Sequence, residues 1–244
     1  MIDQDFIKNQ YRSGVQSYAD FTREVGLWAS EKAVFQQYLR PEMHILDLGC
    51  GTGRTTFPLH ELGYQQIIGV DLTPEMIAAA QKLNAHFQTA IDFRRGDATQ
   101  LEFVDQSFDA VIFSFNGIMS IPGQGRRDRA LAEIKRVLQP GGPFIFTTHD
   151  RGADEQYLDF WRAEKERWQA GEQSKNLYDF GDLITTSKNE EREIYLHIPS
   201  QQEVVGWLQR FDFKVVDTFF RPERFAESPA VLAKSGPCRF WVAR

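Results

Sequence analysis

The spacing of hydrophobic residues divides the chain near residue 44. In residues 1–43, apolar side chains recur every three or four positions, which is the spacing of amphipathic helices. One such helical face holds Tyr11, Val15 and Tyr18, and a second holds Leu27, Val34, Phe35 and Leu39. Pro41 predicts the end of the second helix. We therefore expect residues 1–43 to form an N-terminal helical cover.

After this point, short apolar runs alternate with amphipathic stretches. The runs, which predict strands, cover residues 44–48, 66–70, 91–95, 108–114, 144–148, 214–220 and 239–242. The amphipathic stretches, which predict helices, cover residues 54–62, 74–87, 127–138 and 201–210. This alternation is typical of the α/β class and predicts a doubly wound, seven-stranded, mostly parallel sheet. Ligands bind such sheets at the carboxyl ends of the strands.

Residues 150–196 interrupt the alternation. Residues 155–170 predict a helix, and residues 183–186 and 193–197 predict a hairpin around Ser187, Lys188 and Asn189. The stretch is too short for a core of its own, so we interpret it as an inserted helix–hairpin lid. The expected organisation is a single domain over residues 1–244, with the cover at 1–43, the ligand-binding core at 44–149, the insertion at 150–196 and the rest of the sheet at 197–244.

The most specific motif is a glycine-rich turn directly after the first predicted strand, with Gly49, Gly51 and Gly53. Glycines leave the backbone bare, so a ligand can approach it closely. A dinucleotide-binding turn needs a glycine or alanine at its sixth position, but that position holds Arg54 or Thr56, depending on the register. A P-loop is excluded as well, because the Gly-Lys-Ser/Thr sequence is absent.

This turn resembles the first motif of the class I S-adenosylmethionine-dependent methyltransferases. Segments similar to the later motifs of this family follow in order at residues 69–77, 95–98, 108–116 and 133–142. The resemblance covers roughly residues 44–150, and more weakly 197–243. It implies the Rossmann-like methyltransferase fold, S-adenosylmethionine as cofactor, and S-adenosylhomocysteine as product.

The resemblance also implies roles for three carboxylates. Asp71 would accept both ribose hydroxyls, and Asp97 would meet the adenine amine beside the Ala98 backbone. Asp47 would attract the ammonium of the cofactor, although it could instead cap the glycine turn. The full set of expected cofactor-binding residues is Tyr11, Tyr18, Trp28, Asp47, Gly49, Cys50, Gly51, Asp71, Leu72, Met76, Gly96, Asp97, Ala98, Ser114, Phe115 and Asn116.

Some of these residues have an alternative, structural explanation. Tyr11 and Tyr18 either close over the cofactor or pack within the helices, and Cys50 fits as a small residue, with no base beside it. The acceptor site is expected from residues 150–196 together with the N-terminal helix. Its aromatic residues either line a pocket, fill the core or contact a second subunit: Trp28, Trp161, Trp168, Tyr178 and Phe180.

Catalytic residues are weakly determined, because the cofactor itself carries the activated methyl group. His149, directly after the fifth predicted strand, is the best candidate for a general base, since histidine titrates near neutrality. It could instead cap the strand end. His197 precedes Pro199 and is expected to be structural, and we expect no metal site.

Composition and charge narrow the choice of acceptor. The net charge of −6 and the absence of a basic stripe make nucleic acid an unfavoured partner, and no apolar run predicts a signal peptide or a membrane span. With only two cysteines, the chain is expected in the cytoplasm. We expect methylation of an O or N atom of a small molecule, by a monomer or a homodimer. The alternatives are methylation of tRNA or another macromolecule, and a non-catalytic module that binds the cofactor.

Overall fold

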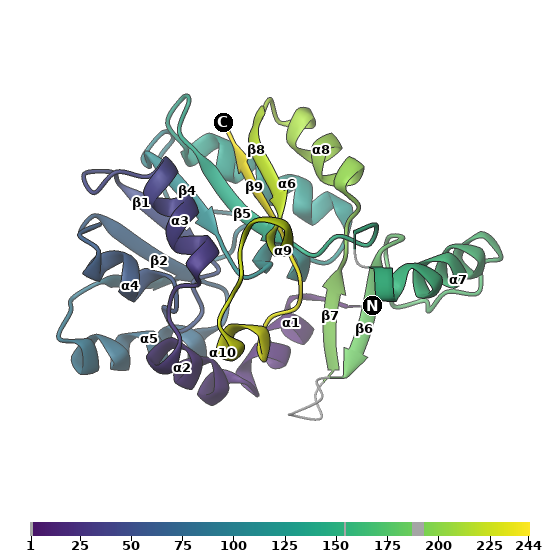
Figure 1. Ribbon diagram of the computed structural model, residues 1–244, viewed down its shortest axis with the longest axis horizontal. Coiled ribbons are helices and arrows are strands. Elements are labelled where there is room, and N and C mark those ends of the chain that lie inside the picture. Colours follow the sequence, from purple (N-terminus) through teal and green to yellow (C-terminus); the bar gives the residue numbers. More distant parts are fainter. Residues whose placement is uncertain (1, 154, 187–192) are drawn as a thin grey trace.

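The computed structural model describes residues 2–153, 155–186 and 193–244 (Figure 1). Its centre is a seven-stranded sheet with the strand order β3-β2-β1-β4-β5-β9-β8. The strands are β1 (Ile45–Leu48), β2 (Ile67–Asp71), β3 (Asp92–Arg95), β4 (Ala110–Phe113), β5 (Phe144–Thr148), β8 (Val215–Phe220) and β9 (Arg239–Ala243). The first five are parallel, and β9 pairs antiparallel with both β5 and β8. The predicted α/β fold is confirmed.

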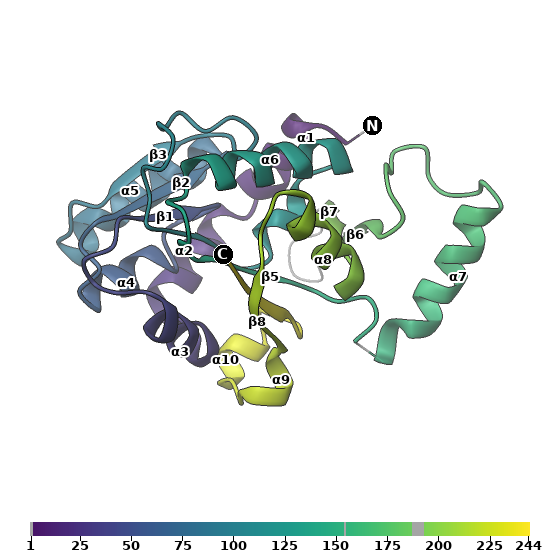
Figure 2. The same cartoon turned by 90° about the horizontal axis from the view of Figure 1, so that it is seen from above.

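Helices cover both faces of the sheet, because alternate residues of each strand point to opposite sides. Ile45 in β1 packs toward α3 (Ala29–Tyr38), α4 (Thr56–Glu61) and α5 (Pro74–Phe87). Its neighbour Leu46 packs toward α6 (Gln124–Val137) and α8 (Gln201–Arg210) on the other face. Figure 2 shows these two layers from above. All four residues of β1 are buried, as expected for a central parallel strand.

The N-terminal cover consists of three helices. The face that Tyr11 and Tyr18 share in the sequence is divided between α1 (Gln4–Arg12) and α2 (Val15–Glu24). Gly14 is the N-cap of α2, and glycine has a low helix propensity, which explains the break. The two tyrosine rings remain neighbours, with centroids 5.9 Å apart.

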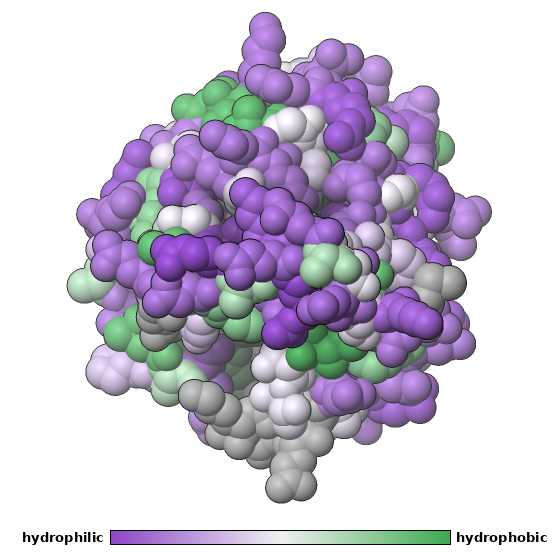
Figure 3. All heavy atoms as spheres, turned by 90° about the vertical axis from the view of Figure 1, so that its right-hand side faces the viewer, coloured by the Kyte–Doolittle hydropathy of each residue, from purple (hydrophilic) through white to green (hydrophobic). Residues whose placement is uncertain are grey.

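The inserted segment contains α7 (Leu158–Gln169) and a two-stranded sheet of β6 (Asp182–Thr186) and β7 (Glu193–His197). The predicted turn at 187–189 lies outside the described residues. The hairpin lies against α1, where the Tyr195 backbone N–H donates to Gln10 Oε1 at 2.9 Å. Helix α7 instead extends away from the sheet (Figures 1 and 2). Figure 3 shows the end of the molecule that carries α7: hydrophilic residues cover most of it, and apolar residues form separate patches.

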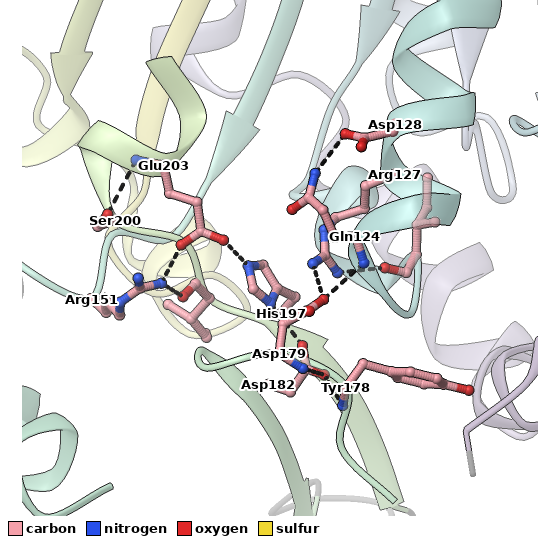
Figure 4. Close-up of polar contacts among 12 residues, drawn as sticks. Gln124, Arg127, Asp128, Arg151, Tyr178, Asp179, Asp182, His197, Ser200 and Glu203 are labelled. Carbon is pink, nitrogen blue, oxygen red and sulfur yellow. Dashed lines mark hydrogen bonds and ion pairs between the residues drawn. The ribbon is translucent and has the colours of Figure 1, made fainter. Parts of the chain in front are cut away.

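A buried network of charged side chains ties the hairpin to the core (Figure 4). His197 in β7 faces Asp182 Oδ1 with Nδ1 at 2.7 Å and Glu203 Oε1 with Nε2 at 2.8 Å. Arg127 in α6 pairs with Asp179 just before β6 at 2.6 Å. Burial alone would raise the pKa of Asp182, but hydrogen bonds, above all that from His197, outweigh burial and lower it. His197 thus has the structural place that its sequence position suggests.

This network predicts a large stability difference between two substitutions. We expect His197→Leu to lower the free energy of unfolding by about 3 kcal/mol, because it leaves the buried carboxylate of Asp182 and the partly buried one of Glu203 without the ring between them. Arg162→Ala removes an exposed ion pair with Asp159 in α7 and should change the free energy of unfolding by less than about 1 kcal/mol. Urea unfolding of both variants measures the difference. Equal losses would contradict this role of the network.

Candidate active site

The glycine-rich turn lies where β1 ends, at the carboxyl edge of the sheet. Gly49 and Gly51 have φ values of 66° and 56°, in the left-handed region that favours glycine. A Cβ on Gly49 would also lie 2.6 Å from Cε2 of Phe113. Both the backbone conformation and the space therefore require glycine at this position.

Asp71 holds this turn against the end of β2. Its Oδ2 accepts from the Gly51 backbone N–H at 2.9 Å, and its Oδ1 accepts from the Thr73 backbone N–H at 2.8 Å. Burial raises the pKa of Asp71, while the two N–H donors act in the opposite direction. Each carboxylate oxygen can accept a further hydrogen bond, so the site can still take hydroxyl donors.

Asp97 lies at the end of the next strand of the sheet, after β3. Its Oδ1 accepts from the backbone N–H and the hydroxyl of Thr99, both at 2.8 Å. Its Oδ2 accepts from the side-chain amide of Gln4 in α1. The N-terminal cover therefore reaches across the strand ends to Asp97.

These elements surround a cavity of about 1080 Å³, including the part that is open to solvent. We call it the first cavity. It is lined by most of the predicted cofactor-binding residues, namely Tyr11, Tyr18, Gly49, Cys50, Gly51, Asp71, Leu72, Met76, Gly96, Asp97, Ala98, Ser114 and Phe115. Burial raises the pKa of the Cys50 thiol well above its usual value, which keeps the thiol protonated and unreactive. Lining residues that the sequence did not point to include Gln4, Arg54, Ser120 and Arg126.

Of the described residues expected at the cofactor, Trp28, Asp47 and Asn116 do not line this cavity. Asp47 lies beneath the turn, 1% exposed, and accepts from the Thr56 hydroxyl at 2.7 Å. Burial, partly opposed by that hydrogen bond, raises its pKa to about 7. Trp28 is fully buried between the guanidinium groups of Arg54 and Arg221, 4.7 and 4.8 Å from them, so it belongs to the core.

Arg54 explains why the glycine pattern of dinucleotide-binding turns fails at this position. Its guanidinium makes two hydrogen bonds of 2.6 Å to the Glu31 carboxylate and one of 2.9 Å to the Gly26 carbonyl. Glu31 is completely buried and Arg54 nearly so. The long side chain at this position therefore connects the turn to the N-terminal cover, a role that only the three-dimensional partner reveals.

A second cavity, of about 650 Å³, adjoins the first. Four residues line both: Tyr11, Tyr18, Phe115 and Ser120. The second cavity is also lined by Gln10, Asn116, His149, Ile194, Leu196, Lys234, Ser235 and Gly236. The insertion thus contributes β7 to this wall. The segment around Lys234–Gly236 carries no motif, so sequence reasoning could not have found it.

The aromatic residues of the insertion lie elsewhere. Trp161 and Trp168 pack against Phe180, with ring centroids 6.1 and 6.3 Å apart. Among the described residues, none of these three lines either of the two cavities, nor does Tyr178, whose hydroxyl donates to the Ile2 carbonyl. The structure brings these side chains to neither cavity, because α7 extends away from the sheet edge.

His149 follows β5 and faces the second cavity. Its Nδ1 lies 2.7 Å from the Pro237 carbonyl oxygen, which can only accept, so Nδ1 carries the proton. The lone pair is then on Nε2, which faces the Asn116 side-chain amide at 3.5 Å. A histidine held in this tautomer can take up a proton at Nε2.

Comparison with known families matches residues 45–142 to a model described as a methyltransferase domain. Residues 45–142 thus form a domain of the class I S-adenosylmethionine-dependent methyltransferases. S-adenosylmethionine is accordingly the cofactor of this domain. The matched segment runs from β1 to the turn before β5, so it contains the glycine turn and the carboxylates Asp71 and Asp97.

Two curated relatives each match slightly less than half of the chain. One is the eEF1A lysine and N-terminal methyltransferase of Bos taurus, 32% identical over 46% of this chain and 17% of the relative. Another is a demethylmenaquinone methyltransferase of Lactiplantibacillus plantarum, 37% identical over 47% of this chain and 48% of the relative. The chain therefore spans less than half the length of either relative.

A solved structure shows a similar fold over most of the chain. It is an S-adenosylmethionine-dependent methyltransferase from Methanosarcina mazei, with a TM-score of 0.69 at 20% identity, and the match covers 90% of this chain and 98% of that one. At this identity the likeness concerns the fold alone. In the described part of this methyltransferase, no helix has the length and apolar character of a membrane span.

The buried carboxyl of Asp47 predicts a pH-dependent stability. Because its pKa is about 7 in the folded protein against 3.8 ordinarily, the folded state holds a proton that the unfolded chain releases. Stability should fall as pH rises from about 4 to about 7 and be constant above that range. The amide of Asp47→Asn does not titrate. The free energy of unfolding of this variant, relative to that of the wild type, should therefore increase by about 1–3 kcal/mol from pH 5 to pH 8.

Urea unfolding at pH 5, 6 and 8 measures this gain. Asp159→Asn, on the exposed surface of α7, controls for the loss of one negative charge. A stability difference between Asp47→Asn and the wild type that stays constant across this pH range would contradict the protonation of buried Asp47.

Proposed function

We propose that this methyltransferase transfers the methyl group of S-adenosylmethionine to an N or O atom of a small molecule that binds in the second cavity. The observation that carries the proposal is that both cavities share four wall residues, Tyr11, Tyr18, Phe115 and Ser120. A methyl donor in the first cavity would therefore be separated from an acceptor in the second only by these four side chains.

In this proposal the first cavity holds the cofactor through the strand ends. Asp71 accepts the ribose hydroxyls with its remaining lone pairs, and Asp97 with the Ala98 backbone receives the adenine. The bare backbone from Gly49 to Gly51 lies against the amino-acid part. Asp47, one layer below, does not line the cavity and so makes no direct contact with the cofactor ammonium.

The protein's part in catalysis is to align the acceptor, exclude water and accept a proton. The bound cofactor supplies the activated methyl group on its sulfonium. Tyr11 donates to or accepts from Ser120 at 2.5 Å, and this contact joins α1 to the turn after β4 above the two cavities. His149, in its Nδ1-protonated tautomer, is the group that accepts the proton released by the acceptor.

A protein acceptor is the second candidate, because a curated relative with 32% identity is an eEF1A methyltransferase. Two structural features favour the small molecule. The N-terminal helices and β7 cover the second cavity. Among the described residues that line it, Lys234 alone is charged. Release of S-adenosylhomocysteine with small amines but not with intact eEF1A would separate the two candidates.

The free thiols of Cys50 and Cys238 suit a reducing compartment such as the cytoplasm.

Substitution of Asp71 tests the cofactor half of the proposal. We expect Asp71→Ala to raise the dissociation constant of S-adenosylhomocysteine about tenfold to a hundredfold, because two ribose hydroxyls lose their charged acceptor. Asp92→Ala, an exposed aspartate in β3, is the matched control and should leave the constant unchanged. Calorimetric titration measures both, and NAD serves as the contrasting ligand.

Thermal melting establishes that each variant is folded, since Asp71 also binds the backbone of Gly51 and Thr73. A dissociation constant within twofold of the wild type in folded Asp71→Ala would remove Asp71 from the ribose site. Tight binding of NAD, with none of S-adenosylhomocysteine, would overturn the proposed function itself.

A further inference from the structure

One buried polar atom beside the second cavity lacks a hydrogen-bond partner. Asn116, three residues after the end of β4, is 7% exposed and lines this cavity. Among the described residues, no donor reaches its side-chain oxygen Oδ1. A carbonyl oxygen that is buried from water without a donor is unfavourable, and natural proteins contain few such atoms. In a ligand cavity, such an atom indicates that the ligand supplies the donor.

The neighbouring histidine determines which end of the Asn116 amide is the oxygen. Because the Pro237 carbonyl holds the proton on His149 Nδ1, Nε2 is an acceptor and requires a donor opposite it. The NH₂ group of Asn116 is that donor, at 3.5 Å. The amide oxygen must then be the atom without a partner, so the assignment follows from chemistry and not from the shape of the amide.

The backbone fixes Asn116 in this position. Phe115 and Asn116 have φ values of 51° and 62°, two consecutive non-glycine residues in the left-handed region. The Asn116 backbone N–H donates to the Thr147 hydroxyl at 2.9 Å. Asparagine tolerates this conformation better than most residues, and strained backbone of this kind concentrates at functional sites. With this backbone, the Asn116 side chain lines the second cavity and not the first.

We propose that Asn116 Oδ1 accepts a hydrogen bond from the acceptor's nucleophilic atom, and that this atom is an amine nitrogen. The inference rests on the proposed function. The Asn116 amide meets Nε2 only at 3.5 Å, the limit of a hydrogen bond, so an amine that carries two hydrogens can donate one to Oδ1 and, in place of that contact, the other to Nε2. In the reaction the amine lone pair bonds to the methyl carbon, the carbon–sulfur bond breaks with its electron pair kept by sulfur, and the released proton passes to His149 Nε2. Asn116 is thus a specificity-determining residue.

Three bisubstrate probes test this inference without knowledge of the natural acceptor. Each is S-adenosylhomocysteine with its sulfur replaced by nitrogen, which bears a 2-aminoethyl, a 2-hydroxyethyl or a propyl arm. The arms have the same length and differ only in the terminal group that would reach the second cavity. We expect the aminoethyl probe to bind the wild-type protein about tenfold more tightly than the propyl probe, as measured by calorimetry.

Two substitutions connect this preference to Asn116. Asn116→Gly keeps the left-handed backbone but removes the amide, so the preference for the aminoethyl probe should fall below about twofold. Asn116→Asp keeps an acceptor oxygen and should retain the preference. Thermal melting and the affinity for S-adenosylhomocysteine, which should stay within about twofold in both variants, show that the first cavity is intact.

The outcomes separate the inference from the function on which it rests. Equal binding of the aminoethyl and propyl probes, tighter binding of the hydroxyethyl probe, or an unchanged preference in Asn116→Gly would each overturn the assignment of Asn116 to an amine. In all three cases S-adenosylhomocysteine still binds. Failure of S-adenosylhomocysteine to bind the wild-type protein would instead overturn the proposed function.

Discussion

The buried ion pair between Arg54 and Glu31 holds the N-terminal helices over the carboxyl edge of the sheet. Arg54 belongs to the glycine turn and Glu31 to α3, and the two 2.6 Å hydrogen bonds join them in a place that water does not reach. Breaking such a pair leaves an uncompensated buried charge, at a cost of about 3–5 kcal/mol. The ion pair therefore holds the glycine turn and the N-terminal cover, which line the first cavity from two sides, in a fixed relative position.

The same unit extends from the first cavity to the second. The Trp28 ring lies between Arg54 and Arg221, and Arg221 donates to the carbonyls of Ser235 and Gly236 in the wall of the second cavity. Next to this wall, Pro237 orients His149. A continuous set of buried contacts thus runs from the cofactor turn to the acceptor side. Packing around Trp28 therefore connects the wall of the first cavity with that of the second.

The parts that could be predicted from the sequence are those encoded by neighbouring residues. The left-handed turn of Gly49 and Gly51 and the carboxylates at strand ends follow from local chemistry and from the edge at which parallel strands finish. Arg54 escaped prediction because its partner lies 23 positions earlier. Asn116 was expected at the cofactor but lines the second cavity, and the rings of α7 line neither cavity, because periodicity does not tell where an inserted helix points.

The central claim is that the cofactor lies in the first cavity with its reactive sulfur toward the second. A crystal structure of the protein with S-adenosylhomocysteine tests it most directly. The account predicts the ribose at Asp71, the adenine at Asp97, and the sulfur at the wall of Tyr11, Tyr18 and Phe115 that both cavities share. A sulfur atom that faces away from the second cavity, or a ligand bound elsewhere on the protein, would contradict it.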